Sequence, residues 1–248
     1  MMSAKPKLRT VSGLPPLSYK AKKAGTLSNY RIYGNTVSGE SVGDRTGNLF
    51  NLESITLKKS LGYDGSIYTA QSSNLSAYIQ ILSDNCVLSY NYTTLASSSK
   101  RNICFYNSKK QCIGYMQYLP TDLSTLISLP ENCKYIRITL DENIYNVMLN
   151  SGSTALPYEP YGYRVPVTVT NGTDTQTTNI YLPEPLTKSG DNADYTDFVT
   201  QKQYYIDGTS ANVTLPALPT LPGTNTLSVG TTVQLSAVEV TGRIKSAE

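Results

Sequence analysis

Short segments in which apolar and polar residues alternate recur along this chain of 248 residues, and this two-residue period restricts the fold most strongly. The clearest case runs from Lys134 to Leu140, where isoleucine and leucine would line one face and polar side chains the other. A helical pattern is limited to residues 121–126, and Pro130 would end it. Many short strands with almost no helix are typical of a β-sandwich or barrel, so we expect an all-β protein.

Two places carry hairpin signals. Tyr145–Leu149 follows the strand at 134–140 after a tight connection, so we expect it to be the hairpin partner of that strand. Asn171-Gly172 separates two alternating runs, and Asn-Gly is the strongest short hairpin signal. The sequence therefore predicts β-hairpins in the middle and in the C-terminal third of the chain.

Changes in composition divide the chain into three segments. Residues 1–47 hold prolines, glycines and scattered lysines, and predict an extended assembly arm that packs against a neighbouring subunit, the alternative being a solvated tail. Residues 48–163 hold most of the alternating strands. Residues 164–248 predict a β-rich assembly region, after a stiff stretch at 155–163 with two prolines and three tyrosines.

Side chains that are missing exclude several kinds of chemistry. The chain has no histidine, which removes Ser-His-Asp and Cys-His catalysis and histidine-based metal sites, so we expect no enzyme and no cofactor. The 21 basic and 18 acidic residues leave a net charge of +3, too small for a dedicated nucleic-acid-binding protein. No stretch approaches the roughly 18 apolar residues that span a bilayer, and the basic N-terminus lacks the apolar run of a signal peptide. We therefore expect neither a membrane segment nor secretion by that route.

The cysteines leave one alternative open. Cys86, Cys104, Cys112 and Cys133 are few for so long a chain, which favours reduced, buried thiols. Cys104 and Cys112 could nevertheless face each other across a hairpin and form a disulfide. A zinc site is disfavoured because no C-x-x-C pair is present.

A second alternative concerns three aspartates. Asp191, Asp194 and Asp197 are spaced three apart and could gather calcium through oxygen ligands. This is not the spacing of an EF-hand loop. Turn formation is the expected role of these residues, and we predict no metal site.

Twenty tyrosines and no tryptophan stand out among the aromatic residues. Tyr90, Tyr92, Tyr115 and Tyr118 are the candidate glycan contacts, because tyrosine offers an apolar face with a polar tip. The alternative is that they are half-buried strand residues, where tyrosine is usually found. Scattered carboxylates add a further alternative, since a glycosidase needs two of them facing each other about 5–9.5 Å apart.

Three groups of residues, in order, resemble a known family. Residues 42–50 (V-G-D-R-T-G-N-L-F) resemble the G-D-x-T-x-N-L-F lead-in of minor structural and tail proteins of bacteriophages of Gram-positive hosts. Residues 134–137 (K-Y-I-R), 146–152 (N-V-M-L-N-S-G) and 157–161 (P-Y-E-P-Y) resemble the closing strands of the jelly-roll module that follows there, which looks like a carbohydrate-binding module. Residues 182–186, 190–195 and 223–225 resemble the β-arch segment that comes after it.

The resemblance implies a jelly-roll β-sandwich at 48–163 and a β-hairpin and β-arch region at 164–248. It also implies a virion component of a tail tip, baseplate or fibre, with other tail proteins as partners, a homo-oligomer (a trimer as the first expectation) and host cell-wall glycan as a further contact. A receptor-binding lectin and a polysaccharide depolymerase are the alternatives. The excess of Tyr, Ser and Thr, without Trp, favours a building part over a lectin.

Overall fold

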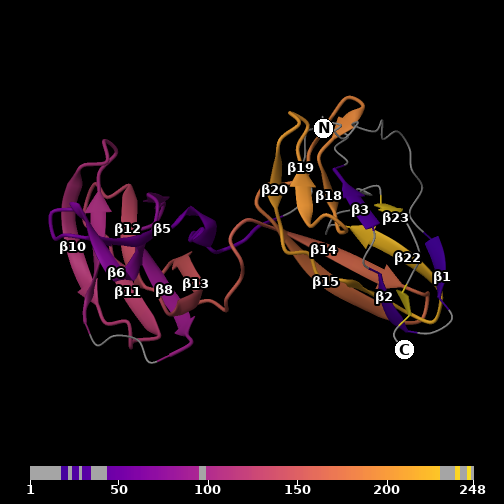
Figure 1. The fold of residues 1–248 in the computed structure, drawn as a ribbon, viewed down its shortest axis with the longest axis horizontal. Helices are drawn as coiled ribbons and strands as arrows, with labels where there is room; N and C mark the ends of the chain where they lie inside the picture. Colours follow the sequence, from indigo (N-terminus) through magenta and orange to yellow (C-terminus); the bar gives the residue numbers. More distant parts are fainter. Residues whose placement is uncertain are drawn as a thin grey trace. The chain divides into compact units, whose positions relative to one another are not determined.

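Residues 46–161 form one β unit, which interrupts a second unit built from the described parts of residues 1–45 and 162–248. The structure is a computed structural model, and it describes residues 18–21, 24–27, 30–34, 44–94, 99–229, 238–240 and 245–246. Both units consist of strands joined by loops (Figure 1), and the helical content of these residues is a single 3-10 turn, η1 (Leu52–Ser54). None of the described residues belongs to a helix long and apolar enough to cross a membrane. The prediction of an all-β protein is confirmed.

The unit at 46–161 is a sandwich of two antiparallel sheets. The larger sheet has the order β10-β9-β12-β6-β5, with β7 also paired to β12. Its strands are β5 (Thr56–Leu61), β6 (Ile67–Leu75), β7 (Ile79–Gln80), β9 (Arg101–Tyr106), β10 (Cys112–Tyr118) and β12 (Tyr135–Asp141). The smaller sheet has the order β11-β8-β13, with β8 (Asn85–Tyr92), β11 (Ser124–Ser128) and β13 (Ile144–Ser151).

One hydrophobic core joins the two sheets. Ile136 and Ile138 of β12 pack in the same buried cluster as Leu88 of β8 and Leu149 of β13. From β7 to β13 the chain crosses between the sheets at every step except from β9 to β10, as in a jelly roll, so each crossing adds apolar surface to this common core. The alternation in residues 134–140 therefore reports a strand with one face in the core, as predicted.

The strand that follows corrects one expectation. Residues 144–151 form β13, which pairs with β8 in the smaller sheet and not with β12. The Asp141 carboxylate accepts a hydrogen bond from Asn143 N at 3.2 Å, and this turn carries the chain across the sandwich. Crossing buries Val147 and Leu149 against the core face of β12, which a hairpin within one sheet would not do.

The β5–β6 hairpin covers part of the outer face of the larger sheet. The backbone of Leu61 accepts from Asn102 Nδ2 at 2.5 Å and donates to Thr139 Oγ1 at 3.0 Å. Gly65 has φ +81°, and a Cβ there would lie 2.9 Å from Cys112 Cβ, so the chain passes too close for a larger residue. Leu61, Cys104 and Tyr106 are buried beneath this hairpin although the latter two point away from the main core.

The other unit contains four small antiparallel sheets. The first has the order β1-β22-β14-β15 with β4 on β14, and comprises β1 (Ser18–Ala21), β4 (Asp44–Arg45), β14 (Tyr163–Thr170), β15 (Thr175–Leu182) and β22 (Gly223–Val229). The second, β20-β19-β18-β3-β23, comprises β3 (Tyr30–Tyr33), β18 (Tyr195–Asp197), β19 (Lys202–Tyr204), β20 (Ser210–Asn212) and β23 (Val238–Val240). The remaining strands are β2 (Gly25–Leu27), β21 (Leu218–Thr220) and β24 (Lys245–Ser246), and the pair β16 (Lys188–Ser189) and β17 (Asn192–Ala193).

This unit divides the chain differently from the three expected segments. Strands β1, β2 and β3, from the expected arm at 1–47, pair with β22, β21 and β18 of the same chain. Leu27, Tyr30 and Ile32 join Val167 and Leu218 in one buried cluster, because the C-terminal sheets alone would leave that apolar face open. Residues 1–17, 22–23, 28–29 and 35–43 of the expected arm lie outside the described residues.

The Asn171-Gly172 hairpin forms with a longer loop than the dipeptide signal implies. β14 and β15 pair from Tyr163↔Leu182 to Thr170↔Thr175, which leaves residues 171–174 as the turn. Asn171 Oδ1 accepts from Thr173 N at 2.9 Å and Asp174 N at 2.7 Å, so its side chain shapes the turn, while Gly172 alone takes a positive φ of 91°.

One asparagine closes the sandwich where the chain enters and leaves it. Asn48 Oδ1 accepts from Phe50 N at 2.9 Å and Leu149 N at 3.0 Å. Asn48 Nδ2 donates to Val147 O at 2.9 Å and Glu159 O at 2.8 Å. Four backbone groups thus depend on one buried amide, whose hydrogen-bonding capacity is fully used.

We expect Asn48→Ala to destabilise the sandwich unit by about 3 kcal/mol or more, because it leaves buried backbone groups unpaired. Asn51→Ala is the matched control, since Asn51 caps only the exposed turn η1 through Glu53 N and should cost less than about 1 kcal/mol. Urea unfolding of the full chain, followed by tyrosine fluorescence, measures both. Equal losses for the two variants would contradict this role for Asn48.

Candidate functional site

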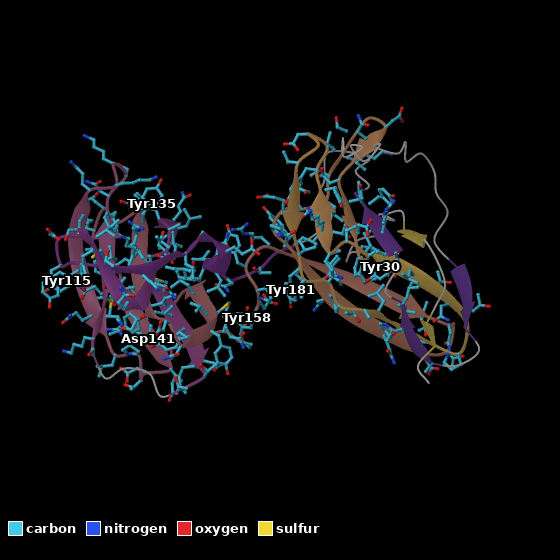
Figure 2. The ribbon with its side chains drawn as sticks, in the orientation of Figure 1. Tyr30, Tyr115, Tyr135, Asp141, Tyr158 and Tyr181 are labelled. Atoms are coloured by element: carbon cyan, nitrogen blue, oxygen red, sulfur yellow. The ribbon has the colours of Figure 1, made fainter. Side chains whose placement is uncertain are left out.

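Aromatic and basic side chains gather at one end of the larger sheet's outer face. Tyr106 ends β9 and Tyr135 begins β12, and the two are direct partners across the sheet, so they share a face. Tyr78 comes from the segment between β6 and β7, Arg137 lies two residues along β12, and Lys110 lies in the β9–β10 turn. These five residues are called the Tyr78 cluster below. Figure 2 shows Tyr135 at this end of the sandwich unit and Asp141, where β12 ends, at the opposite end.

The β9–β10 turn holds Lys110 in place. Asn107 Oδ1 accepts from Lys109 N at 2.9 Å and Gln111 N at 3.1 Å, and Lys110 N donates to Asn107 O at 2.9 Å. Lys110 itself has φ +58°, a left-handed conformation that such a tight turn requires. The turn therefore fixes the direction in which the Lys110 side chain leaves the backbone.

Tyr78 is the centre of the cluster. Its ring centroid lies 4.9 Å from Lys110 Nζ and 4.8 Å from Arg137 Cζ, within the range of cation–π attraction. The rings of Tyr106 and Tyr135 meet it edge-on, with centroids 5.0 Å and 6.3 Å away. Tyr78 keeps 37% of its surface exposed, so the cluster is open to solvent on one side.

Arg137 is the most enclosed charge of the cluster, with 8% of its surface exposed. Its Nε donates to Ser76 O at 3.1 Å. Ser76 is itself fixed, because its hydroxyl accepts from Ile138 N at 2.9 Å. The guanidinium is thereby held against the Tyr78 ring by a rigid part of the sheet.

A hollow of about 540 Å³ shares the β9–β10 turn with the cluster. It is lined by Asn107, Ser108 and Ile113, and by Pro130, Glu131, Asn132 and Lys134 of the next turn. Amide and hydroxyl groups and one side chain of each sign make this surface suited to the hydroxyls of a neutral sugar.

The second exposed aromatic surface is a pair of tyrosines. The rings of Tyr63 and Tyr115 lie 4.8 Å apart at an angle of 33°, and each keeps about half of its surface exposed. Tyr115 is on β10, and Tyr63 is carried to it by the β5–β6 hairpin. Two neighbouring rings with exposed faces are the kind of surface on which a sugar ring stacks.

The structure separates the four predicted glycan contacts. Tyr90 and Tyr118 pack near each other in the core with centroids 6.1 Å apart, and their hydroxyls donate to Leu119 O at 3.3 Å and Thr139 O at 2.7 Å. Neither ring offers a face to solvent, so both are corrected to core residues. Tyr92 is half-buried at the end of β8, and Tyr115 is exposed.

Three exposed or half-exposed tyrosines and one arginine were missed from the sequence. Tyr135 and Arg137 alternate with the core residues of β12, so the polar face of the best-predicted strand was the signal that could have found them. Tyr63 and Tyr78 lie in loops, and no sequence pattern indicates which part of the sheet those loops cover.

Asp194 and Asp197 serve the fold, whereas Asp191 lies exposed in the turn between β16 and β17. Asp194 accepts from Thr187 N at 2.9 Å and Ile206 N at 2.8 Å, and Asp197 pairs with Arg31 Nε at 2.7 Å. Asp197 also accepts from Val199 N at 2.9 Å, which shapes the turn after β18. Across the described parts of the chain, no group of three or more acidic or cysteine side chains could hold a metal ion.

All four cysteines are free thiols, including Cys104 and Cys112. Burial raises the pKa of Cys86 and of Cys104 to about 12, since a thiolate would lose its hydration in either place. Burial raises the pKa of the Tyr118 hydroxyl in the same way. These groups remain neutral at physiological pH and contribute packing to the two sides of the larger sheet.

We expect the free energy of unfolding of the sandwich unit to fall as pH rises above about 9. Unfolded thiols ionise near pH 9 whereas folded Cys86 and Cys104 keep their protons until about 12, so the native state binds more protons in between. Urea unfolding under reducing conditions at about pH 8 and about pH 10.5 measures the change. Cys86→Ala/Cys104→Ala should lose less stability over that interval, and an equal loss would exclude the thiols as its cause.

Comparisons with protein-family models, with curated proteins and with solved structures found no match to this chain. The side chains, the strand order and the motifs at 42–50 and 134–161 therefore supply the grounds for any function.

Proposed function

We propose that this chain is a structural component of a bacteriophage tail tip, baseplate or fibre. In this proposal the sandwich at 46–161 is presented towards the host surface, and the other unit joins neighbouring tail proteins in the virion. The observation that carries the proposal is the closure of the sandwich by Asn48. Thr46, Asn48 and Phe50, from the lead-in motif, are buried, and the Asn48 amide binds Val147, Leu149 and Glu159 of the closing-strand motifs at 146–152 and 157–161.

The hydrogen bonds of Asn48 give a physical reason for the order of the motifs in the sequence. The lead-in motif and the closing-strand motifs, about 100 residues apart in the sequence, meet at one place, where the Asn48 side chain and the backbone close the inserted unit. Such an arrangement supports the comparison with tail proteins in which the same order of motifs brackets a jelly-roll module.

Edge strands of the other unit support an assembly role. β15 ends its sheet among the described residues, and its Thr175–Leu182 segment pairs regularly with β14 and contains no lysine, proline or bulge. Lysines, prolines and bulges in edge strands are the features by which proteins block unwanted strand pairing, so β15 lacks that protection. Pairing of β15 with a strand of a neighbouring subunit or tail protein would satisfy its free backbone groups by strand addition.

We expect the full chain to form a homo-oligomer, with a trimer as the first expectation, and the fragment 46–161 to remain a monomer. Light scattering at micromolar concentration measures both masses. Antibodies against residues 46–161 should label one end of the tail in electron micrographs of the virion. A monomeric full chain, together with unlabelled tails, would overturn the structural role.

A receptor-binding lectin is the second candidate, and the exposed Tyr63–Tyr115 pair favours it. We expect Tyr115→Ala to weaken binding of the full chain to host cell-wall polysaccharide by about two- to tenfold, the range for losing one aromatic contact. Tyr145→Ala is the matched control, because Tyr145 is similarly exposed but lies on β13 of the smaller sheet. Biolayer interferometry with immobilised wall polysaccharide measures the difference, and equal affinities for both variants would exclude the Tyr63–Tyr115 pair as the sugar site.

A further inference from the structure

Arg137 is a buried cation without a carboxylate partner among the described residues. Two other arginines have one: half-buried Arg31 pairs with Asp197 at 2.7 Å, and Arg101 pairs with Asp141 at 2.8 Å. The sandwich unit has as many acidic as basic side chains, so no shortage of carboxylates explains the difference. Burying an unpaired charge costs free energy, and proteins normally compensate for it.

The compensation that Arg137 receives is incomplete. Its Nε is bonded to Ser76 O and the Tyr78 ring lies 4.8 Å from its Cζ. A guanidinium carries five N–H donors, and Nε supplies one of them. The described residues accept no other hydrogen bond from it, and its 8% exposure leaves a path from the free donors to solvent. A guanidinium that is held in place and keeps free N–H donors is well suited to bind an anion.

A second cation reaches the same place. Lys110 Nζ lies 4.9 Å from the centroid of the ring that Arg137 contacts, and the geometry of the β9–β10 turn directs it there. Because each cation lies within 5 Å of the same ring centroid, the two are at most about 10 Å apart, and a bound anion would offset their mutual repulsion. Tyr78 and Tyr135 add partly exposed apolar surface beside the charges.

We propose that the Tyr78 cluster binds an acidic glycan, with Arg137 and Lys110 on its phosphate or carboxylate group and the tyrosines against its sugar or polyol. The proposal rests on the proposed function, in which the sandwich faces the host surface. A nucleic acid fits less well, because single strands need a basic track along the backbone and successive open rings. Here the two cations lie against a single tyrosine ring instead of along a track.

Binding of the full chain to soluble polymers tests the proposal by isothermal titration calorimetry at low salt. Poly(glycerol phosphate) and polygalacturonate supply the two acid groups, neutral dextran is the polymer control, and oligothymidylate represents nucleic acid. We expect at least one acidic glycan to bind, with an affinity that falls as salt is raised, and its identity shows which acid group the site takes. Three results would overturn the proposal. Dextran could bind as tightly as the acidic polymers, neither acidic polymer could bind, or oligothymidylate could bind more tightly than both.

Variants locate the site. Arg137→Gln should weaken binding about tenfold or more, as expected for a buried charge-assisted hydrogen bond. Lys110→Ala should weaken it about two- to fivefold, and because Lys110 is exposed this variant keeps its fold. Lys109→Ala is the matched control: it removes the same charge from the adjacent exposed residue of the same turn and should leave the affinity unchanged.

Thermal unfolding of each variant shows that it is folded before binding is measured. Equal affinities for Lys110→Ala and Lys109→Ala would place the ligand elsewhere and overturn the proposal, even if Arg137→Gln failed to fold. In that outcome, labelled tails and an oligomeric full chain would still support the structural role. Failure of this site is thereby distinguished from failure of the proposed function.

Discussion

The hydrogen bonds of the Asn48 side chain are the constraint on which the sandwich depends. The segments where the chain enters and leaves an inserted unit must be bonded to that unit. Otherwise the first and last residues of the unit would separate from its core. Here one amide bonds Leu149 N and Val147 O of β13 and Glu159 O near the exit. Because the amide is buried, each of these bonds is made in a low-dielectric environment. Losing one would leave a buried backbone group without a hydrogen-bond partner and without access to water. All the hydrogen bonds of this side chain lie within residues 46–161, so the closure involves no residue of the other unit.

Close packing also determines the outer face of the larger sheet. The β5–β6 hairpin lies over Cys104 and Tyr106, at a distance that only a glycine at position 65 permits. It leaves the face with two open aromatic surfaces, the Tyr63–Tyr115 pair and the Tyr78 cluster. The first is uncharged and the second carries two cations, so the two surfaces favour different ligands. A polymer with both neutral and acidic groups could use both.

The sequence predicted individual strands, but it did not predict which strands pair with one another. Alternation at 134–140 gave the core face of β12, because side-chain period is a local property of a strand. It could not show that β13 pairs with β8, since a hairpin and a crossing to the opposite sheet have the same alternation. Tyr90 and Tyr115 illustrate the same limit. Both lie in β-rich segments, but Tyr90 faces the core from β8, whereas Tyr115 faces solvent from β10, where the register shifts between Cys112 and Gly114. Residues 30–33 have the pattern of a short strand and form β3, but β1 and β2 were missed, because Pro- and Gly-rich segments look extended whether or not a distant strand pairs with them.

The chain enters and leaves the inserted sandwich through neighbouring strands. Asp44–Arg45 of β4 pairs with Tyr163–Arg164 of β14, immediately before and after residues 46–161. Gly162, with φ +123°, provides the return, where a Cβ would collide with Leu182 O. A module whose two ends lie this close can be exchanged by recombination for another with similarly placed ends, and the receiving sheets keep their register. The gene can thereby acquire a different inserted unit in one step, without rebuilding the sheets that receive it.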